Sequence, residues 1–149
     1  MLKKTITYED WNGEERTEDF YFNLTRTELI EMEVGMIPGK SLTETLQTLI
    51  TDNDMNTIVK TIKDIVLKAY GVKSSDGKRF VKNQDVRDSF EQNPAYDILY
   101  MELATDSEKA ADFLNGIMPA SIRDNLGENP KEAILVKMKE FEESKQRTN

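Results

Sequence analysis

The chain has 149 residues, of which 38% are hydrophobic and 32% charged, and its formal net charge is −8. This length suits one domain, and this composition lies above the range of disordered chains. Because the sequence contains neither cysteine nor histidine, disulfides, thiolate metal sites, cysteine nucleophiles and Ser-His-Asp catalysis are excluded.

The charge and the apolar runs bear on two further classes of partner. An acidic chain binds phosphate backbones poorly, so we expect no nucleic-acid partner. The sequence has no apolar run approaching the roughly 18 residues that a membrane span requires, so we expect no membrane association. Lys3-Lys4 is followed by the polar run TITYED, so we also expect no secretory signal.

Residues 1–23 predict a β-hairpin with strands at 2–8 and 16–23, both rich in Thr, Ile, Tyr and Phe. Asn12-Gly13 marks the turn. A two-residue turn there would place Ile6 on the opposite face from the phenylalanines of the second strand. A three-residue loop at 11–13 restores one common face and puts Gly13 where a left-handed residue is needed. We predict this second register, with Leu2, Ile6, Tyr8, Phe20 and Phe22 on one face, Glu9, Glu15 and Thr17 facing water, and Trp11 at the loop tip.

Helices are predicted after the hairpin. The capping-box pattern from Thr25 to Glu28 predicts a helix from about residue 26 to Gly35. A second capping box at 41–44 predicts a helix that ends at 52–54. The clearest helix is Met55–Tyr70, where apolar residues recur at spacings of three and four.

The second half of the chain continues in the same way. Residues 72–83 are expected to form a loop around an Asp-Gly turn at 76–77. Helices are expected at about 84–92 and 94–104, and a third capping box at Thr105 to Glu108 opens another. Gly116 and Pro119 predict a break, and a short helical turn at 119–125 and a last helix at 130–144 follow it.

These elements predict an α+β fold that is mostly α. An N-terminal β-hairpin (1–23) is followed by about six to seven helices (24–144) and a polar tail (145–149). All of them are expected to pack as one domain spanning 1–149.

Two stretches superficially resemble ligand-binding loops. A phosphate loop needs four residues between its glycines and Ser or Thr after its lysine, but here five residues separate the glycines of 71–77 and Arg79 follows the lysine. A calcium loop starting at Asp52 would carry Thr57 where glycine is needed and Lys63 where a bidentate glutamate is needed. We therefore predict no catalytic, cofactor-binding or metal-binding residues, and no enzyme activity.

A basic cluster surrounds one aromatic residue, with Lys73, Lys78, Arg79 and Lys82 near Phe80. Nucleic-acid binding is one interpretation. A solvated loop with Phe80 anchored in the core is favoured by the acidic charge of the whole chain. A docking patch for an acidic partner segment is the third.

Trp11 stands out at the expected hairpin tip. A tryptophan outside the core often anchors an interface, although it can also fold back over its own sheet. The hypothetical partner-binding residues are therefore Trp11, Lys78, Arg79, Phe80 and Lys82.

The run TITYEDWNGEERTEDFYFNLTRTELIEME resembles the N-terminus of phage tail assembly chaperones from siphophages, the phages with long non-contractile tails, of Gram-positive hosts. The resemblance continues through LKAYGVKSSDGKRFVKN, NPAYDILYMELATD and KAADFLNGIMPA, so it covers roughly residues 5–120 in the same order. Residues 121–149 carry no such resemblance.

The resemblance implies the short form of such a chaperone. It would bind the tape measure protein, keep it soluble and help to recruit the major tail protein during tail tube assembly. A frameshifted longer form of the same protein would be a further partner, and self-association is left open. The implied location is the host cell cytoplasm, with no copies in the mature virion.

The alternative comes from a different class. An acidic host-takeover protein could mimic the charge of nucleic acid, and its carboxylates would then line one face. The 28 acidic residues here alternate with 20 basic ones, which argues against that alternative.

Overall fold

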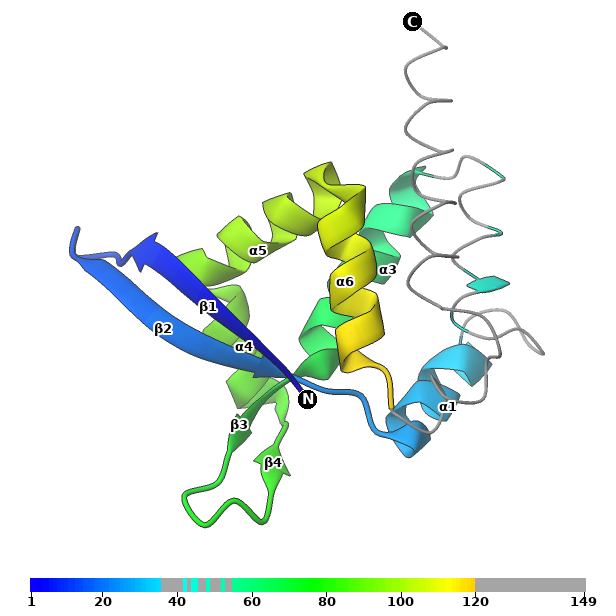
Figure 1. The fold of residues 1–149 in the computed structure, drawn as a ribbon, viewed down its shortest axis with the longest axis horizontal. Helices are drawn as coiled ribbons and strands as arrows, with labels where there is room; N and C mark the ends of the chain where they lie inside the picture. Colours follow the sequence, from blue (N-terminus) through cyan, green and yellow to red (C-terminus); the bar gives the residue numbers. More distant parts are fainter. Residues whose placement is uncertain (36–41, 43, 46–47, 49–51, 53–54, 120–149) are drawn as a thin grey trace, which may run out of the picture.

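A four-stranded antiparallel sheet and five helices form the part of the chain that the structure, a computed structural model, describes: residues 1–35, 42, 44–45, 48, 52 and 55–119. The strands follow the chain order across the sheet and are β1 (Leu2–Glu9), β2 (Glu15–Phe22), β3 (Tyr70–Lys73) and β4 (Phe80–Val81). The helices are α1 (Arg26–Gly35), α3 (Met55–Ala69), α4 (Gln84–Glu91), α5 (Pro94–Thr105) and α6 (Ser107–Ile117) (Figure 1).

The predicted α+β class with an N-terminal β-hairpin is confirmed. The described residues form five helices, fewer than the six to seven expected for the whole chain. The helix expected after the second capping box lies mostly outside the described residues, and the turn at 119–125 and the helix at 130–144 lie almost wholly outside them. Within the described residues, no helix has the length and apolar character that crossing a membrane would need.

β1 and β2 pair in the predicted register, from Leu2 opposite Phe22 to Glu9 opposite Glu15. The Asp10 amide donates to the carbonyl of Glu14 over 2.8 Å, and Gly13 has a φ of 81°. The three-residue loop is therefore confirmed, with its glycine in the left-handed region. As expected, the inner face is buried at Ile6, Tyr8, Phe20 and Phe22, and Glu9, Glu15 and Thr17 are exposed.

The turn expected at 76–77 is confirmed, but the expectation of a loop over all of 72–83 within an all-helical segment 24–144 is wrong. Helix α3 ends at Ala69, and the chain then runs directly into β3, which pairs with β2 through Tyr21 opposite Gly71. β4 returns antiparallel to β3, with Lys73 opposite Phe80. The physical reason is that β3 supplies backbone partners to the far edge of β2, and strands of four and two residues are too short to show a periodicity.

Side-chain caps fix where the helices begin. Thr25 and Glu28 form the predicted reciprocal capping box, with each backbone amide donating to the other's side chain over 3.0 and 3.1 Å. Asn83 and Asn93 cap α4 and α5 by accepting from backbone amides. Asparagine serves well here because its side-chain oxygen reaches the unpaired amides of the first turn.

The cap expected at Thr105 is wrong. Thr105 is still part of α5, and its hydroxyl donates to the carbonyl of Met101 over 2.6 Å. Asp106 caps α6 instead, because its carboxylate accepts from the amides of Glu108 and Lys109 over 3.0 and 3.1 Å. A carboxylate can accept both hydrogen bonds, and the positive end of the helix dipole stabilises its negative charge. A neutral hydroxyl gains less from that dipole.

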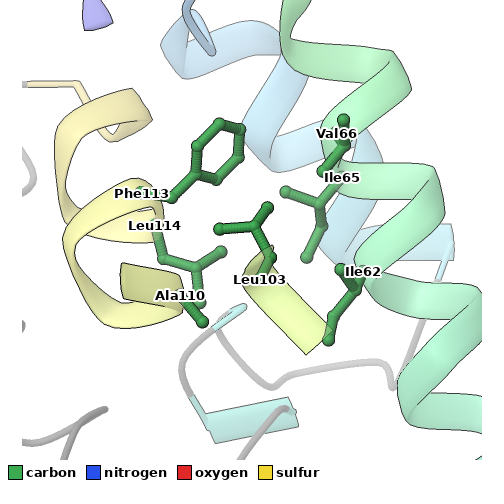
Figure 2. Close-up of a pocket in the computed structure, with 7 residues that line it drawn as sticks. All are labelled: Ile62, Ile65, Val66, Leu103, Ala110, Phe113 and Leu114. Carbon is green, nitrogen blue, oxygen red and sulfur yellow. The ribbon is translucent and has the colours of Figure 1, made fainter. Parts of the chain in front are cut away.

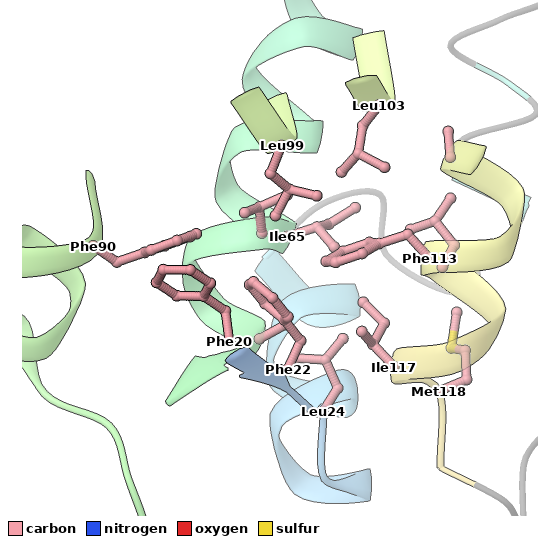
Figure 3. Packing of buried hydrophobic residues seen from close by; sticks show 14 of the residues in the cluster. Phe20, Phe22, Leu24, Ile65, Phe90, Leu99, Leu103, Phe113, Ile117 and Met118 are labelled. Carbon is pink, nitrogen blue, oxygen red and sulfur yellow. The ribbon is translucent and has the colours of Figure 1, made fainter. Parts of the chain in front are cut away.

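The core lies between the inner face of the sheet and the helices (Figure 3). Phe22 is fully buried, and its ring centroid lies 5.2 Å from that of Phe113 on α6 and 5.6 Å from that of Phe90 on α4. The ring of Tyr70, the first residue of β3, stacks on Phe90 at 4.2 Å. These aromatic contacts tie β2 and β3 to the helices on one face of the sheet.

Candidate partner-binding surface

Asp10 organises the tip of the first hairpin. Its carboxylate accepts from the backbone amides of Asn12 and Glu14 over 2.9 and 3.0 Å, and from Arg16 Nε over 2.6 Å. The hydrogen bond from Arg16, and then that from the Glu14 amide, lower the pKa of Asp10. The tip is therefore a hydrogen-bonded loop with a fixed shape.

Trp11 projects from this loop with 83% of its surface exposed. Its Nε1 donates to the carbonyl of Gln92, at the end of α4, over 3.1 Å. The indole therefore does not fold back over the sheet, and one hydrogen bond holds it in place. An aromatic side chain that is both exposed and held loses little conformational entropy when a partner binds it.

The second hairpin has a tip of similar construction. The amide of Gly77, which has a φ of 74°, donates to the carbonyl of Ser74. Asp76 accepts from the Ser74 hydroxyl over 2.7 Å and from the Lys78 amide over 3.0 Å, and the bond from Ser74 contributes most to lowering the pKa of Asp76. Lys78 and Arg79 are exposed on this turn, and neither has an ion-pair partner within the described residues.

Phe80 is half-buried, and it lies on the face of the sheet opposite to the core. A Cβ atom at Gly71 would come within 2.7 Å of the Phe80 ring, so glycine lets this ring lie flat across β3. On the same face, Lys73 Nζ lies 4.0 Å from the centre of the Tyr21 ring. The interpretation that anchors Phe80 in the core is therefore wrong, because the Phe80 ring does not belong to the buried core cluster.

Lys82 is held inside the domain. Its Nζ donates to both carboxylate oxygens of Glu28 over 2.8 Å and to the carbonyl of Asn23 over 2.6 Å. Burial lowers the pKa of Lys82, against the opposing effect of Glu28. Burial also works to raise the pKa of Glu28, but the hydrogen bonds from Lys82 and Thr25 outweigh it and leave this pKa below its usual range. Lys82 thus joins the end of β4 to α1, whatever its role toward a partner.

The structure brings only some of the predicted residues together. Lys78, Arg79 and Phe80 belong to one hairpin, whereas Trp11 stands at the tip of the other, on a different side of the molecule (Figure 1). Tyr21 was missed as a surface aromatic, although its alternation with Phe20 and Phe22 already placed it on the opposite face. We call the exposed face that carries Tyr21, Lys73 and Phe80 the outer face.

A small cavity lies elsewhere, between α3, α5 and α6 (Figure 2). Its volume is about 10 Å³, close to that of one water molecule. Its lining is entirely apolar and consists of Ile62, Ile65, Val66, Leu103, Ala110, Phe113 and Leu114. Such a cavity presents no side chain that could donate, accept or transfer a proton, and no group of potential metal ligands occurs among the described residues.

The comparisons with known proteins agree with the resemblance found in the sequence. The model of one family, described as phage tail assembly chaperone, matches residues 1–149, which is the whole chain. Neither the curated proteins nor the solved structures gave a match. Because the family match covers both hairpins and all five described helices, this chain belongs to the phage tail assembly chaperone family.

Proposed function

We propose that this chain binds the tape measure protein, keeps it soluble and helps to recruit the major tail protein during tail tube assembly. The match of the tail assembly chaperone family to the whole chain carries this proposal. We further propose that it acts in the cytoplasm of a siphophage's Gram-positive host as the short form, beside a frameshifted longer form. In this role it would have no enzymatic activity and would be absent from the mature virion.

The physical task is to cover apolar surface on a long helical chain. A tape measure protein that exposes apolar seams would aggregate unless they were covered. Many copies of a small chaperone can cover such seams with weak contacts, which add through avidity and still allow tube subunits to displace the copies.

Exposed apolar side chains are available for such contacts. Ile30 and Val34 lie one turn apart on α1 and expose 56% and 71% of their surfaces. Trp11 provides a third apolar contact, at the hairpin tip. We assign tape measure binding to these side chains. We also propose that Lys78 and Arg79 bind acidic segments of the same partner.

Co-expression with the tape measure protein of the same genome, followed by size-exclusion chromatography, tests the function. We expect the tape measure protein to be insoluble alone and to co-elute with many copies of this chain. If it remains insoluble when both are produced, the short form does not solubilise it and the proposal fails.

Trp11→Ala tests the hairpin tip. Because Trp11 is exposed, the variant should remain folded but bind the tape measure protein about tenfold or more weakly, as expected for an interface anchor. Trp11→Phe is the matched control, since it keeps an aromatic ring but lacks the indole N–H that donates to Gln92. Binding by Trp11→Ala at the wild-type level, measured on the co-purified complex, would remove Trp11 from the interface.

A further inference from the structure

β1 forms the open edge of the sheet. It pairs with β2 on one side, and no strand in the described part of the chain pairs with its other side. In an antiparallel pair, successive residues point their backbone groups alternately toward and away from the partner strand. The Asp10 amide points toward β2, where it bonds to Glu14. Counting back from Asp10, Lys3, Thr5, Thr7 and Glu9 direct their amides and carbonyls away from β2.

This edge is long and regular. β1 has eight residues, and none of them is proline. Its ladder with β2 runs without a bulge from Leu2 to Glu9. Natural proteins usually shorten, bulge or cover such an edge, because its free backbone groups invite another strand.

The residues along the edge are complementary to themselves. If a second β1 lies antiparallel with Ile6 opposite Ile6, then Lys3 faces Glu9 and Thr5 faces Thr7, twice across the two-fold axis. A shift by two residues in either direction leaves the lysine without its carboxylate. Lysine on an edge normally opposes pairing, but in this one register each Lys3 meets an opposite charge.

Helix α5, which packs against β1, carries two exposed apolar side chains. Helix α5 packs beneath β1, and Lys4 Nζ donates to the carboxylate of Glu102 over 3.2 Å. Another side of the helix faces α3, where the Tyr100 hydroxyl lies 3.5 Å from the carbonyl of Val59. Ile98 lies one turn before Glu102, on the β1 side of the helix, and it exposes 42% of its surface. Met101, three residues later, exposes 51%.

We propose that two copies of this chain pair through their β1 edges in an antiparallel, two-fold arrangement that continues the sheet from one copy into the other. The pairing satisfies the outward backbone groups of β1, matches Lys3 with Glu9, and covers Ile98 on both copies. It uses neither Trp11 nor the β3–β4 turn, so the dimer leaves these two of the proposed partner-binding regions accessible. The dimer does not depend on the proposed function.

Proline substitution tests the backbone contacts. The Thr7 amide points outward, so Thr7→Pro should keep the β1–β2 ladder and abolish the dimer. Thr17→Pro is the matched control, because Thr17 faces Thr7 across the ladder, shares its side-chain hydrogen bond of 2.9 Å, and points its own amide away from β1. Sedimentation equilibrium at up to about 0.5 mM, near the millimolar limit of weak association, should show a dimer for the wild-type chain and for Thr17→Pro, and a monomer for Thr7→Pro. A monomeric wild-type chain, or a dimeric Thr7→Pro, overturns the proposal.

Charge exchange tests the register and does not depend on how proline is tolerated. Lys3→Glu and Glu9→Lys each place like charges opposite each other twice, and each should weaken the dimer about tenfold. The double variant restores both opposite-charge pairs, so its dissociation constant should return to within about threefold of the wild-type value. A double variant as weak as the single variants would show that Lys3 and Glu9 do not face each other.

Discussion

The two hairpins of this protein have similar turns but differ in the length of their strands. Each turns through a glycine with positive φ, at Gly13 and Gly77, and in each an aspartate accepts backbone amides at the turn. The first hairpin has strands of eight residues and buries Ile6, Tyr8, Phe20 and Phe22 on its inner face. The second has strands of four and two residues, and it depends on β2 for its place in the sheet.

This difference shows how a short hairpin is held. The β1–β2 hairpin contributes its own row of core side chains, whereas β3 contributes Tyr70 and is otherwise fixed by neighbours. Those neighbours are Phe90 beneath Tyr70, Phe80 across Gly71, and Glu28 bonded to Lys82. Variants that remove these contacts one at a time show how much each contact contributes to the stability of each hairpin.

Phe22→Ala should have the largest effect, because the Phe22 ring contacts aromatic residues from β3, α4 and α6. We expect a loss of about 3–5 kcal/mol of unfolding free energy, as for other large-to-small core substitutions. Denaturant unfolding measures it. Tyr21→Ala, one residue earlier on the outer face, is the control and should cost about 1 kcal/mol. Equal losses for both variants would contradict the assignment of the two faces.

Gly71→Ala should disturb only the second hairpin. The added Cβ would lie 2.7 Å from the Phe80 ring, so this ring must move, at a cost of about 1–3 kcal/mol. Adding Phe80→Ala removes the obstacle, so the double variant should be more stable than the sum of the single changes predicts. Additive losses in a double-mutant cycle would mean that the two residues do not touch.

Lys82→Met should loosen the junction between β4 and α1. It leaves Glu28 partly buried without its cation, and since neither side chain is fully buried we expect a loss of about 1–2 kcal/mol. The double variant Lys82→Met with Glu28→Gln removes the orphaned charge and should regain part of this stability.

The same ion pair predicts a pH dependence. Because the folded-state pKa of Glu28 is lowered, its stabilising contribution is complete above the usual glutamate pKa and is lost as the pH falls through the lower folded-state value. Glu28→Gln should therefore lose less stability than the wild-type chain over that acidic interval. Parallel stability curves for the two proteins would contradict this assignment.

The two turn aspartates should give the smallest effects. Asp10→Asn loses a charged bond to Arg16 as well as weakening two backbone bonds, whereas Asp76 has no cation partner among the described residues. We therefore expect Asp10→Asn to lower the melting temperature slightly more than Asp76→Asn does. Calorimetry gives the two values, and amide exchange at Asn12 and Lys78 shows whether each turn has opened. A larger effect of Asp76→Asn would reverse the expected order.

The first hairpin was predictable because its information is local. In the predicted register Ile6, Tyr8, Phe20 and Phe22 share one face, whereas a shift by one residue would separate Ile6 from the two phenylalanines. The capping box at Thr25 was predictable for the same reason. Asp106 was missed because Thr105 beside it also fits a cap, and only the continuation of α5 through Thr105 decides between them.

The second hairpin and the outer face were not predictable in this way. β3 forms because it can pair with the open edge of β2, and no pattern within 70–81 indicates that this edge is available. For the same reason, the sequence could show a cluster of cations near Phe80 but could not show that Lys82 turns inward to Glu28 while Lys78 and Arg79 remain exposed.

The sequence by itself determined the α+β class, the register of the long hairpin, the position of Trp11 at its tip and the resemblance to the family. Each of these depends on residues close together in the chain. Only the tertiary structure decided that Tyr70–Val81 joins the sheet, that Phe80 covers the outer face, and that β1 is left as an open edge. Those features depend on contacts between segments distant in sequence, and such contacts form only when the whole chain packs.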